Sequence, residues 1–172
     1  MHADQIETKA DSTRTLGGKY LTFILGRASY GIDVLKIREI IRLVEFTSVP
    51  QMPDFVKGVI NLRGKIIPVV DLRIKFRLST AESTERTCIV VVQVEVTPGT
   101  KTLMGLVVDG VEEVLNISHN DIEAAPDFGT RLDTNHILGM AKIKGAVKTL
   151  LDINRVMAAE TLAAIDQSLA HA

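Results

Sequence analysis

The chain has 172 residues, of which 46% are hydrophobic, so it is long enough to bury the core of one domain or of two small ones. Its 20 basic and 21 acidic residues give a net charge of −1, which argues against a general nucleic-acid-binding protein, because such proteins rely on many phosphate contacts. The single cysteine, Cys88, excludes an intrachain disulfide and indicates a reducing compartment.

The first 17 residues predict a flexible polar leader. The stretch MHADQIETKADSTRTLGG (1–18) lacks the apolar core of a signal peptide. The sequence also contains no apolar run of the roughly 18–20 residues that a membrane-spanning helix needs. We therefore expect a cytoplasmic protein without direct membrane contact.

Residues 18–155 read mainly as short β-strands. The stretch KYLTFILG (19–26) is apolar and aromatic, and TCIVVVQVEV (87–96) alternates as a half-buried strand does. A Pro-Gly pair then suits a tight turn, after which KTLMGLVVDG (101–110) returns as a hairpin partner. Short strands with little room for crossover helices favour small barrels. Pro68 interrupts an apolar run, so we expect its strand to lie at an edge or to be bulged there.

Two stretches have helical features. DVLKIREIIRL (33–43) spaces its apolar residues as a helix does but is β-branched, so one or two helical turns fit it as well as a strand. The alanine-rich end of the chain predicts a C-terminal helix over residues 156–172, with Leu162, Ile165 and Leu169 on one stripe. We expect this helix to cover an open barrel end; a partner-binding helix is the alternative.

An internal repeat organises the chain. GVINLRGKIIPVVDL (58–72) matches GMAKIKGAVKTLLDI (139–153), and YGIDVLKIREII (30–41) matches MGLVVDGVEEVL (104–115). The tripeptide PDF also occurs twice, between the paired stretches. The order of all three elements is kept, which indicates two copies of one small β unit with a dividing line near residue 80. A barrel of about 65 residues is marginal alone, so we expect the two copies to pack together, with strand exchange open.

The sequence offers little chemistry for a cofactor or a reaction. GVINLRGK (58–65) has the wrong glycine spacing for a phosphate loop, places Ile66 where Ser or Thr would bind magnesium, and precedes a strand-like run. The histidines (His2, His119, His136 and His171) lack metal-ligand spacing. Cys88 opens an apolar strand, as a buried inert thiol does. We expect no catalytic residue, no metal and no cofactor, and with aromatic residues at 4%, no nucleic acid.

Two sets of polar residues recur in both copies. Asp71 and Asp152 occupy equivalent positions, and this symmetry favours a structural role, such as accepting backbone N–H bonds at a strand end. Arg63 corresponds to Lys144, so the basic charge follows the repeat but the guanidinium does not. Arg63 is either a solvated strand-end charge or an anchor for a protein partner, with Glu39 as its ionic partner.

Four stretches together resemble the CheW-like domain family of bacterial chemotaxis coupling proteins. They are YGIDVLKIREI (30–40), PDFVKGVINLRGKIIPVVDLRIKF (53–76), GLVVDGVEEVL (105–115) and APDF (125–128). The resemblance implies an all-β fold of two packed five-stranded SH3-like barrels that share a third hydrophobic core. It also implies an adaptor without catalysis, which joins the cytoplasmic tips of methyl-accepting chemotaxis receptors to the regulatory domain of the histidine kinase CheA in membrane receptor arrays.

The resemblance also assigns candidate contact residues. In that family the receptor tip docks in a groove between the barrels, and the matching positions are Ile37, Glu39, Gly58, Asn61 and Arg63. Phe128, in the second PDF, matches a position linked to kinase contacts. The alternative function is a free-standing tandem barrel that binds a ligand or a nucleic acid, and the affinity of a nucleic-acid complex would fall steeply with salt.

Overall fold

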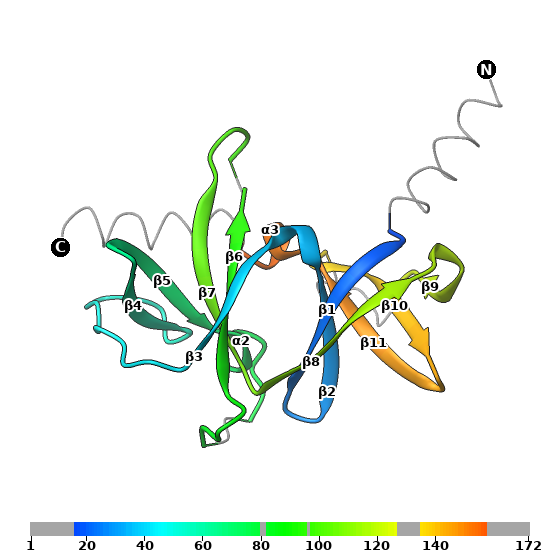
Figure 1. Ribbon diagram of the computed structural model, residues 1–172, viewed down its shortest axis with the longest axis horizontal. Helices are drawn as coiled ribbons and strands as arrows, with labels where there is room; N and C mark the ends of the chain where they lie inside the picture. The colour runs from blue at the N-terminus through cyan, green and yellow to red at the C-terminus, as the bar shows by residue number, and fades with distance from the viewer. Residues whose placement is uncertain (1–15, 80–81, 96, 127–134, 158–172) are drawn as a thin grey trace.

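The structure, a computed structural model, describes residues 16–79, 82–95, 97–126 and 135–157 and consists mainly of β-strands (Figure 1). The strands are β1 (Gly18–Leu25), β2 (Ala28–Asp33), β3 (Ile37–Arg42), β4 (Val56–Leu62), β5 (Lys65–Asp71), β6 (Cys88–Val94), β7 (Thr102–Val108), β8 (Gly110–Ile117), β9 (Ile122–Glu123), β10 (Ile137–Ile143) and β11 (Ala146–Leu151). The short helices are η1 (Val34–Lys36), α2 (Leu72–Lys75), η2 (His119–Asp121) and α3 (Ile153–Val156). The predicted all-β class is confirmed. No helix in these described ranges is long and apolar enough to cross a membrane.

The strands form two curved sheets that lie side by side (Figure 1). One has five strands in the order β3-β6-β7-β5-β4, and the other has six in the order β8-β1-β2-β11-β10-β9. The sixth strand is β9, which has only two residues and pairs with β10. Without β9, each sheet has the five strands that the family resemblance implied, and the two strand orders match under the repeat.

The two sequence copies exchange strands between the sheets. Gly31 of β2 pairs in parallel with Leu150 of β11, and Gly105 of β7 pairs in the same way with Val69 of β5. These two pairs correspond to each other under the repeat, although each joins one strand from each copy. The chain therefore passes from the six-stranded sheet to the five-stranded sheet after β2 and returns to the six-stranded sheet at Asp109. The boundary between the two sequence copies, in contrast, lies near residue 80.

Glycine makes the exchanged pairing sterically feasible. A Cβ atom on Gly31 would lie 2.8 Å from Cδ2 of its exchanged partner Leu150. One on Gly105 would lie 3.3 Å from Cγ2 of its exchanged partner Val69 and 2.8 Å from Cγ2 of Ile89 on β6. Carbon atoms in contact normally stay near 3.5–4.0 Å, so a side chain at either glycine would crowd these neighbouring side chains.

Three hydrophobic clusters fill the molecule. The largest takes side chains from both sheets, including Phe23 of β1 and Leu106 of β7, and also holds α3. A second cluster lies within the five-stranded sheet around Val69 and Val91. The third lies within the six-stranded sheet around Leu150. The largest cluster is the shared core that the family resemblance implied, and its burial of apolar side chains stabilises the packing of the two sheets against each other.

Three local predictions from the sequence concern the stretch 33–43, Pro68 and the C-terminal helix. The stretch 33–43 forms the short η1 turn and then strand β3. The edge position expected for the strand of Pro68 is wrong, because β5 lies inside the sheet between β7 and β4. Proline is tolerated there because β7 pairs with β5 only from Val69 onward. The alternative of a bulge has partial support, because the β4–β5 ladder shifts register next to Pro68, opposite Val69 and Val70. A short helix, α3, ends at Val156, and the helix expected over 156–172 lies outside the described residues except for its first two.

Two aspartates cap the short helices at equivalent positions. The Asp71 side chain accepts the backbone N–H of Arg73 at the start of α2. The Asp152 side chain accepts the N–H groups of Asn154 and Arg155 at the start of α3. The structural role that symmetry favoured for this pair is confirmed.

Candidate protein-binding surface

The hairpin turn between β4 and β5 positions Arg63. Arg63 and Gly64 both have positive φ, 51° and 83°, as a two-residue hairpin turn with right-handed strand twist requires. The side-chain oxygen of Asn61 accepts the N–H of Gly64 at 2.8 Å and so stabilises the turn. In the other copy, Lys144 and Gly145 have φ of 51° and 80°, which confirms the predicted equivalence of the two turns.

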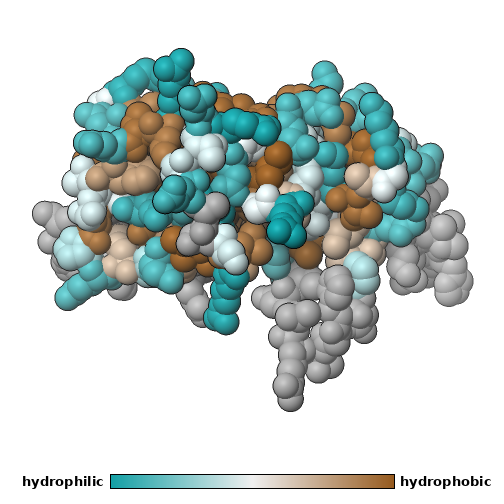
Figure 2. Space-filling view, turned by 90° about the horizontal axis from the view of Figure 1, so that it is seen from below, coloured by the Kyte–Doolittle hydropathy of each residue, from teal (hydrophilic) through white to brown (hydrophobic). Residues whose placement is uncertain are grey.

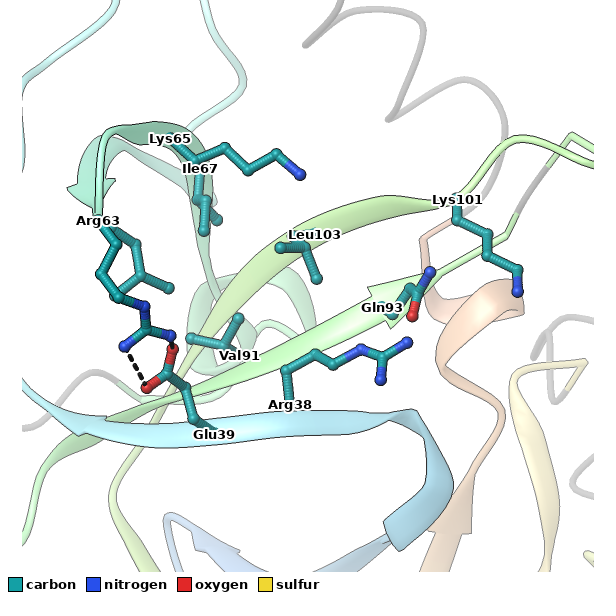
Figure 3. Close-up of a pocket in the computed structure, with 10 residues that line it drawn as sticks. Arg38, Glu39, Arg63, Lys65, Ile67, Val91, Gln93, Lys101 and Leu103 are labelled. Atoms are coloured by element: carbon teal, nitrogen blue, oxygen red, sulfur yellow. Dashed lines mark hydrogen bonds and ion pairs between the residues drawn. The ribbon is translucent and has the colours of Figure 1, made fainter.

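Arg63 forms the expected ion pair with Glu39 of β3. The guanidinium donates through Nη1 to Oε2 at 3.3 Å and through Nη2 to Oε1 (Figure 3). The Arg63 side chain is 74% exposed and that of Glu39 only 26%. An exposed pair of this kind adds little stability, but its two parallel bonds hold the guanidinium at a defined angle. Although the equivalent positions are Glu113 and Lys144, no ion pair joins them in the part of the chain that the structure describes.

Glu39 and Arg63 line an open hollow of about 570 Å³ in the five-stranded sheet. Its apolar floor consists of Leu62, Ile67, Val91 and Leu103, and its polar rim consists of Arg38, Glu39, Arg63, Lys65, Gln93 and Lys101. Figure 3 shows Val91 and Leu103 between the Arg63–Glu39 pair on one side and Gln93, Arg38 and Lys101 on the other. The hollow is formed by this sheet alone, whereas the family resemblance implied a groove between the barrels.

The rim of the hollow is strongly basic. Its four basic residues and one acidic residue give a formal charge of +3, whereas the whole chain carries −1. Among the described residues, Arg38, Lys65 and Lys101 form no ion pair, and all three are exposed. Charge of one sign gathered around a low-dielectric floor raises the local concentration of oppositely charged partners.

The other expected receptor-contact residues have different positions. Gly58 is buried in β4 with φ of 141°, and a Cβ atom there would lie 2.2 Å from the carbonyl oxygen of Thr47. Ile37 begins β3 and packs against the shared core. Of the five expected residues, only Glu39 and Arg63 line the hollow, and Asn61 supports Arg63 through the turn. The close approach of Thr47 is a packing reason for the glycine at position 58. Phe128, the expected kinase contact, lies outside the described residues.

Sequence reasoning missed Arg38, Lys65, Gln93 and Lys101. Three of them could have been found from the alternation of residues along the strands. Each of the three lies two positions from an apolar floor residue, and residues two positions apart on a strand point to the same face. The pairs are Lys65 with Ile67, Gln93 with Val91, and Lys101 with Leu103. Gln93 and Leu103 are also direct cross-strand partners. Only the sheet order shows that these strand ends meet at one hollow.

Large apolar side chains are exposed at equivalent positions of the two copies. Ile40 and Ile66 of the five-stranded sheet are 45% and 64% exposed. Their counterparts in the six-stranded sheet, Val114 and Val147, are 52% and 59% exposed. Figure 2 shows hydrophobic residues reaching the surface among hydrophilic ones across the molecule. Apolar surface on both sheets is consistent with protein partners on both.

Other chemistry has little support in the described residues. No group of three or more His, Cys, Asp or Glu side chains among them could hold a metal ion. Cys88 is only partly exposed, and burial raises the pKa of its thiol. A raised pKa reduces the thiolate fraction at neutral pH, and the thiolate is the nucleophilic form.

The chain is similar to known chemotaxis proteins. The family model described as "CheW-like domain" matches residues 19–161. The chain is 37% identical over 152 residues to "Chemotaxis protein CheW" of Klebsiella aerogenes, which covers 88% of this chain and 89% of that protein. It is 32% identical over 154 residues to the protein of the same name in Rhizobium meliloti, covering 89% and 96% of the two chains.

A solved structure has the same fold. The crystal structure of the scaffolding protein TtCheW from Thermoanaerobacter tengcongensis matches with a TM-score of 0.73 at 33% sequence identity. The match covers 84% of this chain and 95% of that one. It supports the arrangement of two sheets described above.

Proposed function

The chain belongs to the CheW-like domain family, and from this premise we propose that it couples methyl-accepting chemotaxis receptors to the histidine kinase CheA within receptor arrays. The family consists of chemotaxis scaffold and adaptor proteins. In this role the protein binds two partners at once and performs no reaction. It acts in the cytoplasm, is recruited to membrane receptor arrays, and needs neither cofactor nor nucleic acid.

The observation that carries the proposal is the Arg63–Glu39 pair at the rim of the hollow. The pair presents a pre-oriented guanidinium beside exposed apolar surface, and arginine in such a setting is favoured at protein interfaces. We assign the receptor tip to this surface, with Glu39, Asn61 and Arg63 as contact or positioning residues. Ile37 and Gly58 support it from β3 and β4.

The kinase regulatory domain binds elsewhere on the same body in this proposal, and Phe128 is assigned to that contact. Two separate surfaces allow the adaptor to hold receptor and kinase at the same time. A signal then passes as a change in relative affinity or geometry among three proteins. In this proposal the adaptor unit comprises residues 18–155, and residues 1–17 and 156–172 keep the leader and the helix expected from the sequence.

A binding experiment with purified components tests the proposal. The full chain is titrated with a receptor signalling-tip fragment and with a CheA regulatory domain, separately and together. We expect saturable binding of each partner and a ternary complex that contains all three. If either partner fails to bind, or if one displaces the other completely, the adaptor proposal is wrong. Saturable ATP binding in the micromolar range would overturn an adaptor-only role.

A further inference from the structure

We propose that the receptor segment that occupies the hollow is acidic and amphipathic, with an apolar side chain against the floor and carboxylates against the rim. The inference rests on the proposed adaptor function and adds the chemistry of the partner. It follows from the charge of the rim, from the bonding of Arg63 and from the composition of the floor.

The first step is the charge of the rim. Arg38 comes from β3, Lys65 from the start of β5, and Lys101 from the residue before β7, so three chain segments bring cations to one opening. None of them forms an ion pair within the described ranges, and although Glu39 shares their rim and Glu95 lines an adjoining hollow with Arg38 and Lys101, the cluster keeps an excess of positive charge. Carboxylates on a partner would relieve the repulsion within this cluster, whereas a basic partner would increase it.

The second step is the state of Arg63. A guanidinium has five N–H donors, and two of its nitrogens already donate to Glu39. The side chain remains 74% exposed, so its remaining donors face solvent at a fixed angle. Glu39 therefore aims Arg63 without using all of its hydrogen bonds, and a partner carboxylate can accept those that remain.

The third step is the floor. Ile67 and Val91 are 1% and 0% exposed and belong to the core of this sheet, so they form a rigid base. Leu62 and Leu103 are partly buried and border the opening. An inorganic anion would match the rim but leave the partly exposed side chains of Leu62 and Leu103 in water. A protein segment that combines an apolar side chain with flanking carboxylates matches both parts of the hollow.

The test reverses the rim charge and leaves the rest of the molecule unchanged. The double variant Lys65→Glu/Lys101→Glu alters two exposed side chains outside the core. The single variant Lys144→Glu is a control for charge reversal, because Lys144 is exposed in the equivalent turn of the six-stranded sheet. Each folded protein is titrated with the receptor-tip fragment and with the kinase regulatory domain at about 50 mM and about 500 mM salt, a range over which surface charges become largely screened.

We expect the double variant to bind the receptor tip at least about tenfold more weakly than wild type at low salt, with a smaller difference at high salt. The Lys144→Glu variant should bind the tip as wild type does, and kinase binding should change less. Wild-type binding that persists at high salt would support the contribution of the apolar floor. Unchanged tip affinity in the double variant overturns the acidic-partner inference but leaves the adaptor function intact. Failure of the wild-type protein to bind the tip overturns the adaptor function itself.

Discussion

Arg73 and Asp109 form an ion pair, with 2.9 Å between Nη1 and Oδ1, that connects the two sheets. The same guanidinium donates to both carboxylate oxygens of Asp71, at 3.2 Å through Nε and 3.0 Å through Nη2. The second oxygen of Asp109 accepts the backbone N–H of Gly26 at 2.7 Å. Because Gly26 follows β1 and Arg73 lies in α2, the network ties the six-stranded sheet to the five-stranded one.

The Arg73 network predicts a large stability loss on substitution. The Arg73 side chain is 6% exposed and that of Asp71 is fully buried. Arg73→Gln therefore leaves a buried carboxylate whose remaining partners are its own cap bond to the N–H of residue 73 and the Lys57 ammonium, 3.9 Å away. We expect the free energy of unfolding to fall by about 3–5 kcal/mol, as measured by urea denaturation. Arg155→Gln is the control, because Arg155 pairs with Asp152 at a site where its side chain is 63% exposed, and its loss should stay below about 1 kcal/mol. Equal losses would show that Arg73 is not part of a stabilising network.

Gly58→Ala should destabilise the protein through the backbone. The substitution adds a methyl group 2.2 Å from the Thr47 carbonyl oxygen and forces alanine into a φ of 141°. We expect a loss of about 3 kcal/mol or more, read from thermal or urea unfolding. Gly64→Ala is the control: its φ is 83°, but nothing lies within 4 Å of the added carbon, so the loss should be about 1–2 kcal/mol. A Gly58→Ala protein with wild-type stability would show that Thr47 can move away.

Arg63→Ala should separate binding from stability. The residue is exposed and outside the core, so the melting temperature should change little. Loss of an interface anchor commonly costs about 2 kcal/mol, which corresponds to a roughly thirtyfold weaker receptor-tip affinity by titration. Kinase affinity should fall less. Lys144→Ala is the matched control, because it has the same φ of 51° in the equivalent turn. Unchanged receptor affinity, or equal losses for both partners, would identify Arg63 as a solvated strand-end charge.

Ionisation of the Cys88 thiol should lower the free energy of unfolding as the pH becomes alkaline. Burial raises the pKa of its thiol in the folded state above the unfolded value. The contribution to stability is therefore fully present below the unfolded pKa of about 8.5 and is lost as the pH rises through the higher folded pKa. Burial also raises the pKa of Tyr20 and Tyr30, so the Cys88→Ser variant is needed as a reference. Between about pH 8 and pH 10, urea denaturation should show a steeper loss for the wild type than for Cys88→Ser. Parallel curves would exclude a contribution from the thiol.

Local features of this protein were predictable from the sequence. The matched turns at Arg63 and Lys144 follow from a glycine after a basic residue between two apolar runs, and the aspartate caps follow from their position after a strand. The Glu39–Arg63 pair followed from acidic and basic residues that recur at matched positions. The turns and the caps rest on residue types whose backbone preference acts over a few residues. The Glu39–Arg63 pair instead joins the two edges of the five-stranded sheet, β3 and the turn after β4, which the curvature of the sheet brings together.

The repeat by itself determined that the chain contains two copies of one β unit, but only the tertiary structure decided which strands pair. The two copies have similar hydrophobic patterns, so β2 could pair locally with β5 as well as with β11; the observed partner is β11. Strand partners depend on contacts between residues far apart in sequence, here the shared core around Phe23 and Leu106. For the same reason, no local pattern shows that Arg38, Lys65 and Lys101 meet at one hollow: the three belong to different segments, and the order of the strands in the folded sheet brings them together.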